Sequence, residues 1–374
     1  MSGFDDSAPV YQVTDNQHYD AAEERSTTDG SSWSESSSGR TMSTLGSGEV
    51  AEYFRDLHGF QYTADENLPI VFPSDSRAER LFVVQHTIIK LCQEGKNVPN
   101  VVDELILRGG VDGTGARVLD LVTNSGTWVH EMAEIYPNAT FLSLDVKPLT
   151  AFEPHPKIGF EVYDIYAGIA EPDVSFDVVY ARQTVTLAKD YNMLLREMHR
   201  VLKPGGALVI TEIPSQAYEA RNPSVILHSA PRRVAAVQIF RGMLQHQGID
   251  LTVWDDMAKR LDPGHSLWGN STSDNVNKDS HPPTPAVIRG FHTITHRSHL
   301  IPGGPWPDNQ EQKIIGALAR LLFTDVYRAM LPLLQMMGME EAQAQGMVDG
   351  LLEEMADPRY PAYAKCEVWC ARKI

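Results

Sequence analysis

Short apolar strands alternate with helical segments between residues 117 and 212, and this alternation limits the chain to few folds. Helices are predicted over Thr127–Ile135 and Tyr191–Leu202, where apolar side chains recur at helical spacing. Strands are predicted over residues 117–122, 140–145, 158–164, 176–181 and 207–212. Apolar strands separated by helices are typical of a parallel sheet that is covered on both faces. The sequence therefore predicts an α/β fold with a doubly wound sheet.

The chain divides by composition near residue 46. Residues 1–46 are rich in Ser, Thr and Gly and poor in aliphatic side chains, so they are predicted to form a disordered tail that buries too little apolar surface to offset its chain entropy. Residues 47–374 are predicted to be one domain. We divide it into a helical cover (47–110), a core (111–214), and a region of insert helices and closing strands (215–374).

The segments outside the core are mainly predicted helices. Val50–Leu57 is predicted to form a short helix, and Arg77–Leu91 a longer one that Asp75 or Ser76 caps. Further helices are predicted over residues 232–247, 310–335 and 340–355, a loop over 265–285, and a last strand around Val368. Lys203–Gly206 reads Lys-Pro-Gly-Gly and is predicted to be a tight turn.

Charge and hydropathy exclude two classes of partner. The formal net charge is −17, and so acidic a chain is repelled by phosphate backbones, so no nucleic-acid partner is expected. No run of apolar residues is long enough to span a bilayer, so no membrane partner is expected either.

Cysteine and histidine usage predicts a reducing compartment and no metal. The chain has 3 cysteines, an odd and sparse count that does not suit a disulfide framework. We therefore expect a cytoplasmic protein, with the nucleus as the alternative. Cys366 and Cys370 fall in an alternating, strand-like stretch, and His292, His296 and His299 lack an acidic partner pattern, so no metal site is predicted.

Polar residues follow the predicted strands at their carboxyl ends, where ligands bind in doubly wound sheets. The first strand ends near Asp120, before a turn that leads into a helix. The second ends at Asp145, a carboxylate suited to ribose hydroxyls. The third ends at Asp164 and Ile165, and the fourth at Arg182 and Gln183. Any one aspartate could equally cap the next helix, so the prediction depends on their order and spacing.

This order resembles the motifs of class I S-adenosylmethionine (SAM) methyltransferases. Residues 118–128, Val-Leu-Asp-Leu-Val-Thr-Asn-Ser-Gly-Thr-Trp, look like their motif I, and residues 176–183 and 194–206 look like their later motifs. The chain is most similar to the fungal LaeA-like group through segments near Tyr53, Arg80–His86, Ile301–Pro307 and the last strand. The resemblance covers roughly residues 47–374 and implies a Rossmann-like seven-stranded sheet with a helical N-terminal cover and a helical C-terminal insert.

The resemblance also implies SAM as cofactor and a set of residues around it. Asp120 would anchor the first turn or the amino-acid end of SAM, and Asp145 and the adjacent Val146 would hold the ribose. Asp164 and Ile165 would frame the adenine, and Arg182 and Gln183 would lie near the methionine part or the acceptor. The first turn would contribute Val122, Asn124 and Gly126. Tyr53, Arg80 and His86 would close the pocket from the N-terminal cover. No residue identifies itself as a catalytic base.

One departure from the family pattern divides the functional hypotheses. The family has glycine at the positions of Val122, Asn124 and Gly126, and only Gly126 is kept. Glycine serves there because the backbone approaches the cofactor and requires positive φ, which Asn tolerates but the β-branched Val122 disfavours.

The first hypothesis is a SAM-dependent methyltransferase that acts on a small molecule or a protein, in fungal secondary metabolism or its regulation. The alternative is a catalytically degenerate protein that keeps the fold and works through a regulatory protein partner, which the LaeA-like group's link to velvet regulators implies. An NAD-dependent oxidoreductase is disfavoured because Gly-x-Gly-x-x-Gly is absent. The acceptor pocket is expected from the N-terminal cover and residues 215–310.

Overall fold

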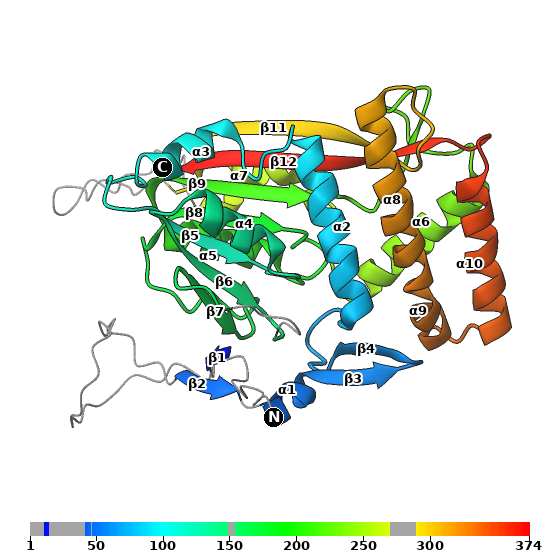
Figure 1. Ribbon diagram of the computed structural model, residues 1–374, viewed down its shortest axis with the longest axis horizontal. Coiled ribbons are helices and arrows are strands. Elements are labelled where there is room, and N and C mark those ends of the chain that lie inside the picture. Colours follow the sequence, from blue (N-terminus) through cyan, green and yellow to red (C-terminus); the bar gives the residue numbers. More distant parts are fainter. Residues whose placement is uncertain (1–10, 15–41, 46, 149–153, 270–288) are drawn as a thin grey trace, which may run out of the picture.

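The computed structural model describes residues 11–14, 42–45, 47–148, 154–269 and 289–374, and its centre is one large mixed sheet (Figure 1). The strands lie in the order β10-β12-β9-β8-β5-β6-β7-β1-β2, and β11 pairs with the other side of β12. Their bounds are β5 Arg117–Leu121, β6 Thr140–Asp145, β7 Ile158–Val162, β8 Phe176–Arg182, β9 Leu202–Glu212, β10 Tyr218–Glu219, β11 Phe291–Pro302 and β12 Ala362–Lys373.

Seven of these strands confirm the predicted Rossmann-like sheet. β7, β6, β5, β8 and β9 are consecutive parallel neighbours, whereas β12 runs antiparallel to both β9 and β11. Within the run from β5 to β9, the chain begins in the middle at β5, adds β6 and β7 on one side, and then crosses to β8 on the other. The strand order therefore reverses at β5, and the carboxyl ends of β5, β6 and β8 meet where a ligand site is expected.

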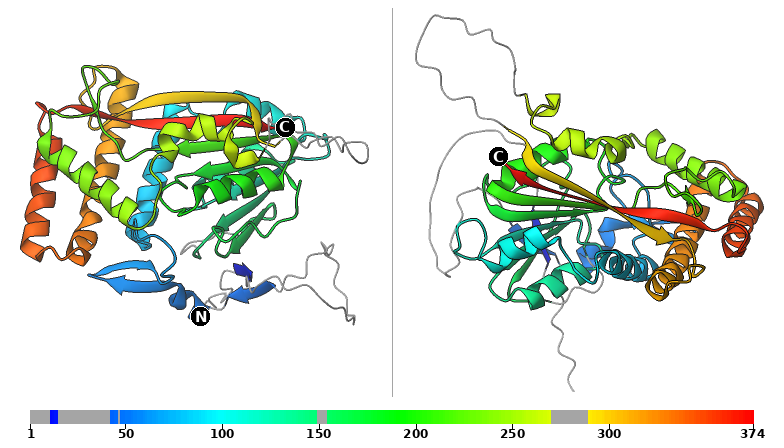
Figure 2. Two further views of the ribbon diagram at one scale, coloured as in Figure 1. Left: turned by 180° about the vertical axis from the view of Figure 1, so that it is seen from behind. Right: turned by 90° about the horizontal axis from the view of Figure 1, so that it is seen from above.

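Helices cover both faces of the sheet, as the doubly wound pattern requires (Figure 2). Alternate residues of each strand enter opposite cores, so Leu119 packs on one face and Val118 on the other. The first face carries α5 (Tyr191–Val201) and α7 (Val253–Leu261), and the second carries α2 (Ser76–Cys92), α3 (Asn100–Leu107), α4 (Thr127–Ile135) and α8 (Gln310–Arg328). Sequence analysis did not predict α7.

The N-terminal cover combines helices with an unexpected hairpin. Instead of one helix over Val50–Leu57, the chain forms α1 (Ser47–Val50), a short 3-10 turn (Ala51–Tyr53) and strand β3 (Phe54–Leu57), which pairs with β4 (Phe60–Thr63). His58 and Gly59 connect the two strands with φ of 51° and 77°. Positive φ at both central residues gives the turn that matches strand twist, so the predicted helix is wrong there. The longer helix is confirmed as α2, and Asp75 accepts a hydrogen bond from the Ala78 amide.

A group of C-terminal helices lies beyond the ends of β11 and β12 (Figure 1). It contains α6 (Pro231–His246), part of α8, α9 (Met330–Met336) and α10 (Glu341–Ala356). The single helix predicted over residues 310–335 is divided at Ala329. Pro332 explains the division, because proline has no N–H and its ring clashes with the carbonyl four residues earlier, that of Arg328.

Two strands differ from their predictions. Lys203–Gly206 is a bulge inside β9 and not a turn before it, since the β8–β9 register shifts there. Gly206 is required, because a Cβ would lie 2.7 Å from the Lys203 carbonyl oxygen. β11 was not predicted, and it contains the three histidines considered above: His296 stacks on Trp369 and its Nε2 lies 2.7 Å from Glu367.

The predicted tail lies mostly outside the described residues. Within it, strands β1 (Tyr11–Thr14) and β2 (Met42–Leu45), which sequence analysis did not predict, extend the sheet beyond β7. The predicted loop is described only for residues 265–269 and contains a short 3-10 turn, Ser266–Trp268. None of the described helices is long and apolar enough to cross a membrane. All three cysteines are buried free thiols.

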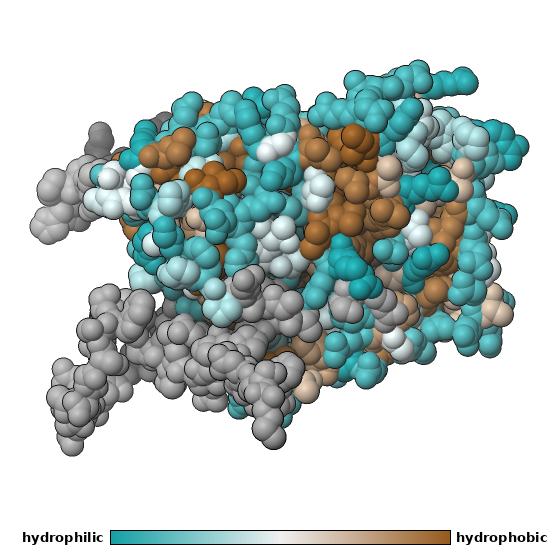
Figure 3. Space-filling view, in the orientation of Figure 1, coloured by the Kyte–Doolittle hydropathy of each residue, from teal (hydrophilic) through white to brown (hydrophobic). Residues whose placement is uncertain are grey.

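Apolar surface gathers where α2 and α8 lie side by side (Figure 3). Val83 on α2 and Ile314 and Leu321 on α8 are large apolar side chains that remain exposed there.

Candidate functional site

Two cavities adjoin at the carboxyl ends of the central strands. The first encloses about 690 Å³, including its open mouth, and is lined by the turns after β5, β6 and β8 and by the N-terminal cover. The second encloses about 860 Å³ on the same basis and lies among α6, α8 and β12. Three residues line both cavities: Phe72, Gln85 and Gln183. A molecule in the first cavity would therefore meet a molecule in the second at this shared wall.

The turn after β5 keeps the backbone shape that glycine would give. Val122, Asn124 and Gly126 have φ of 63°, 56° and 73°. Two hydrogen bonds hold the turn against β6, since the amides of Val122 and Thr123 both donate to the Leu144 carbonyl. The Asn124 side chain donates to the Val122 carbonyl. The surrounding bonds thus enforce a left-handed conformation on a β-branched residue, which stores strain at this turn.

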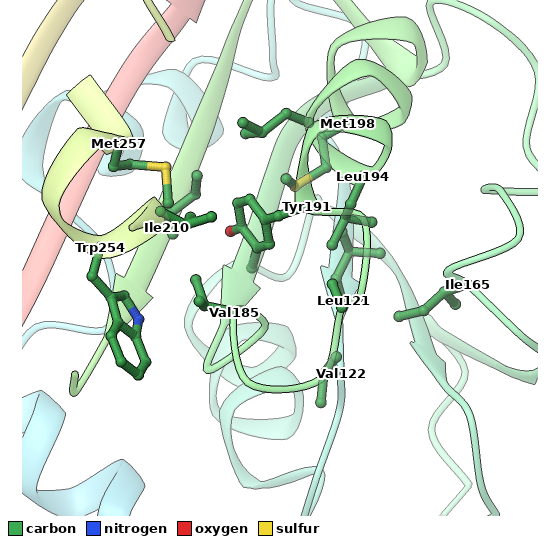
Figure 4. Packing of buried hydrophobic residues seen from close by; sticks show 14 of the residues in the cluster. Leu121, Val122, Ile165, Val185, Tyr191, Leu194, Met198, Ile210, Trp254 and Met257 are labelled. Atoms are coloured by element: carbon green, nitrogen blue, oxygen red, sulfur yellow. The ribbon is translucent and has the colours of Figure 1, made fainter. Parts of the chain in front are cut away.

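Figure 4 shows Val122 directly after Leu121, at the border of the packed cluster that contains Tyr191 and Leu194. Its side chain is 3% exposed and lines the first cavity. The Val122 side chain therefore fills space that a glycine at this position would leave open.

Asp145 connects the first turn to the second. It ends β6 with its carboxylate buried, Oδ2 accepting from the Asn124 amide at 3.0 Å and Oδ1 from the Val146 amide at 2.8 Å. Burial raises the pKa of Asp145, although Lys147 and these amides oppose the shift. Each carboxylate oxygen has a further lone pair, so Asp145 can still accept hydrogen bonds from a ligand in the first cavity.

Lys147, which sequence analysis missed, also lines the first cavity. Its ammonium donates to Ser74 Oγ at 3.1 Å, and burial lowers its pKa while Asp145 opposes the shift. The sequence did contain a signal for Lys147 as a site residue, because it follows Asp145 by two residues at the same strand end.

The turn after β8 places Gln183 on the shared wall. Gln183 has a φ of 56°, and its amide donates to the Thr211 carbonyl. Glu212, at the end of β9, accepts from the Thr184 and Val185 amides at 2.7 and 3.2 Å. Burial raises the pKa of Glu212 to about 7. Glu212 was not predicted as a site residue, and it acts by fixing the turn that carries Gln183.

Asp164 and Ile165 do not line either cavity. Asp164 Oδ1 accepts from the Tyr166 amide at 2.9 Å, and Ile165 is fully buried in the core. Their neighbour Tyr166 lines the first cavity instead. The third strand end therefore contributes a tyrosine where an acid and a backbone edge were expected.

Asp120 and Arg182 are buried beneath the site and line neither cavity. Asp120 accepts from Ser143 Oγ at 2.6 Å, and burial raises its pKa to about 6. Arg182 donates to His86 Nδ1 at 2.9 Å, and His86 Nε2 lies 3.4 Å from Glu131. Burial, with Arg182 second, lowers the pKa of His86 to about 4. This set forms a supporting polar network behind the turns.

The structure thus brings together half of the predicted cofactor residues. The five that line the first cavity are Val122, Asn124, Asp145, Val146 and Gln183. Gly126 does not line it and begins α4 in the left-handed conformation. The N-terminal cover closes the cavity through other residues than Tyr53, Arg80 and His86, namely Tyr62, Thr63, Leu68–Ser74, Phe82 and Gln85.

The donor set of the first cavity suits a nucleoside. Two polar atoms that line it, Tyr166 Oη and Gln183 Nε2, are buried and lack a hydrogen-bond partner within the described part of the chain. Buried polar atoms are normally paired, so these two await a ligand or water. Together with the buried Asp145 carboxylate and the left-handed turn, they fit the ribose and amino-acid groups of SAM, and Val122 is the one feature that crowds them.

The second cavity is mainly apolar. Its walls come from the loop after β9, from α6, α8 and β12, and from single residues of α9 and α10. The N-terminal cover contributes Phe72 and Gln85, as expected, but most of the lining comes from residues 213–240 and 303–364, only partly within the predicted 215–310.

Comparison with known proteins agrees with this geometry. Residues 95–262 match a family model described as a methyltransferase domain. The chain is 21% identical over 272 residues to methyltransferase pytC of Aspergillus terreus, covering 72% of this chain and 71% of that protein. It is 22% identical over 269 residues to the secondary metabolism regulator LAE1 of Cochliobolus heterostrophus, covering 69% and 76%.

Among solved structures, phosphoethanolamine N-methyltransferase 2 of Haemonchus contortus in complex with SAM is 18% identical. The match covers 80% of this chain and 61% of the Haemonchus contortus chain, with a TM-score of 0.39.

Proposed function

We propose, from the premise that this chain is a class I SAM-dependent methyltransferase of the LaeA-like kind, that it binds SAM in the first cavity and methylates a small molecule in the second. The regulators and methyltransferases among its relatives support a role in secondary metabolism or its regulation. The observation that carries the proposal is the wall that both cavities share, with the unpartnered amide nitrogen of Gln183 in it.

Asp145 would accept the ribose hydroxyls, and the Val122–Gly126 turn would approach the amino-acid end. Tyr166 and Gln183 would use their unpartnered groups on the same ligand. SAM supplies an electrophilic methyl group when it is bound. The aromatic side chains of Phe72 and Phe82, which line the first cavity, would exclude water from it. These roles place the two reactants without acid–base chemistry.

The residues of the shared wall also bear on whether methyl transfer needs a catalytic base. Phe72, Gln85 and Gln183 do not titrate at physiological pH. The acceptor atom is therefore proposed to arrive as a nucleophile, and catalysis consists of orienting it.

A second candidate function has one specific observation in its favour. The left-handed Val122 is strained, and its side chain occupies the first cavity. A protein that has lost the cofactor and acts through a regulatory partner would tolerate this residue.

Calorimetric titration of the purified full chain with SAM and with S-adenosylhomocysteine tests the proposal. We expect both to bind well below millimolar concentration, because the ribose acceptor and the turn are in place. Absence of binding by either ligand near millimolar concentration would overturn it. Co-purification of a stable partner in that case would favour the second candidate.

A further inference from the structure

We propose that the acceptor bound in the second cavity is a small molecule with an apolar body and one anionic group, and that Arg233 binds this group. The inference rests on the proposed methyl transfer, because it names the substrate class of the same site. Arg233 lies near the start of α6 and lines the second cavity.

The body of the ligand follows from the lining. Leu322, Phe323 and Val326 of α8 line the cavity together with Ala236 and Phe240 of α6. This space, about 860 Å³ with its open mouth, is bounded mainly by apolar side chains. Such walls recognise a rigid apolar skeleton by shape and burial, and polar groups on it must find one of the few polar side chains present.

Arg233 is a buried cation that lines this cavity and has no ion-pair partner among the described residues. The residue is 5% exposed, and its Nε has no hydrogen-bond partner among the described residues. Its guanidinium makes one long hydrogen bond, from Nη2 to the Tyr360 carbonyl at 3.5 Å. No carboxylate of the described residues lies within salt-bridge distance of this guanidinium.

Arg260, another buried arginine, shows which partners the Arg233 guanidinium lacks. Arg260 is similarly buried, at 8% exposed, but its guanidinium binds Asp250 at 2.7 Å and Asn192 at 2.8 Å. At the start of α6, the Glu354 carboxylate accepts hydrogen bonds from the Arg232 and Arg233 backbone amides, at 3.1 and 2.8 Å, and none from the Arg233 guanidinium. Arginine remains charged when buried, so an anion in the cavity would supply the ion-pair partner that the Arg233 guanidinium lacks.

The position of Arg233 also separates two parts of the ligand. Arg233 lines the second cavity but not the first, whereas methyl transfer must occur at the wall of Phe72, Gln85 and Gln183. The anionic group that Arg233 binds is therefore not the group that is methylated. It is an anchor that fixes which other atom of the acceptor reaches the shared wall.

Two matched probes test the anion site on the full chain without cofactor: 2-naphthoate and 2-naphthamide, which share an apolar body and differ in charge. We expect the carboxylate to bind at least about tenfold more tightly, since charge-assisted bidentate pairs exceed neutral ones by this margin. Dissociation constants come from calorimetry or ligand-observed NMR. Equal binding of the two probes, or no binding of naphthoate, would overturn the proposal.

Three variants locate the effect. Arg233→Gln should remove the preference for naphthoate and leave naphthamide binding unchanged, and Arg233→Lys should keep part of the preference. Arg232→Gln is the matched control, because Arg232 is the neighbouring cation on α6, pairs with Glu353 at 3.4 Å on the surface and does not line the cavity. A preference that survives Arg233→Gln, or that Arg232→Gln also removes, would contradict the assignment. If Arg233→Gln does not fold, the wild-type comparison and Arg233→Lys still decide.

SAM titration of the same preparation keeps the two proposals apart. SAM binding without a naphthoate preference overturns only the anion site. A naphthoate preference without SAM binding overturns only the proposed methyl transfer.

Discussion

The two adjoining cavities are assembled in opposite ways. The polar wall of the first comes from turns that follow consecutive parallel strands, so Val122, Asn124, Asp145 and Gln183 lie together because of chain order. Most of the second is formed by helices and a strand between residues 213 and 364, which are far apart in the sequence. Strand order therefore places the residues of the first cavity, whereas the residues of the second depend on how helices far apart in the sequence pack against one another.

The largest effect should come from the first cavity. Asp145→Ala removes the carboxylate that would bind both ribose hydroxyls and that also holds the Asn124 amide. We expect SAM affinity to fall at least about 100-fold, since two charge-assisted hydrogen bonds are lost. Asp164→Ala is the matched control, because Asp164 lies just after the end of β7 but lines neither cavity. Calorimetry with S-adenosylhomocysteine measures both, and equal losses would mean that the cavity is not the cofactor site.

The second prediction compares packed core with cavity wall. Leu194 on α5 is fully buried in the cluster of Figure 4, so Leu194→Ala should cost about 3 kcal/mol of unfolding free energy. Phe240 borders the second cavity and is 8% exposed, against 0% for Leu194. Phe240→Ala should therefore cost less, although it removes the larger side chain. Urea unfolding measures both, and a greater loss for Phe240→Ala would mean that its surroundings are closed and packed.

The third prediction concerns the polar network behind the first cavity. Burial, then Arg182, lowers the pKa of His86 to about 4 from an ordinary value of 6.5. Neutral His86 therefore contributes stability that is complete above pH 6.5 and is lost as the pH falls toward 4, a loss of about 3 kcal/mol. His86→Gln keeps an acceptor for Arg182 but does not titrate, so its unfolding free energy should depend less on pH over this interval. Identical pH profiles for the two proteins would contradict this account.

Particular residues show what sequence could and could not predict. Six of the seven strands were predicted from the sequence, since alternating strands and helices leave few topologies open. The count of seven came from the family resemblance. Val122 and Asn124 were identified as positions that require positive φ, and both have it. Arg233 and Tyr166 were missed because nothing in the local sequence marks them. Their roles depend on which helix or loop packs beside the strand ends. β11 was not predicted because its exposed face is polar along most of its length.

The smallest expected effect tests the strain itself, through Val122→Gly and Asn124→Gly. Glycine at residue 122 relieves a left-handed conformation that costs about 1–2 kcal/mol, while it loses the burial of a valine, worth about 1.5–3 kcal/mol. These terms nearly cancel, so thermal unfolding should change little. SAM affinity should rise about tenfold, because the turn no longer crowds the cavity and already has the required shape. Asn124→Gly should change affinity less, since Asn tolerates positive φ and its side chain also holds the Val122 carbonyl. If Val122→Gly weakens SAM binding, the valine side chain is a contact of the cofactor, and the first cavity is shaped for SAM in a way that glycine does not reproduce.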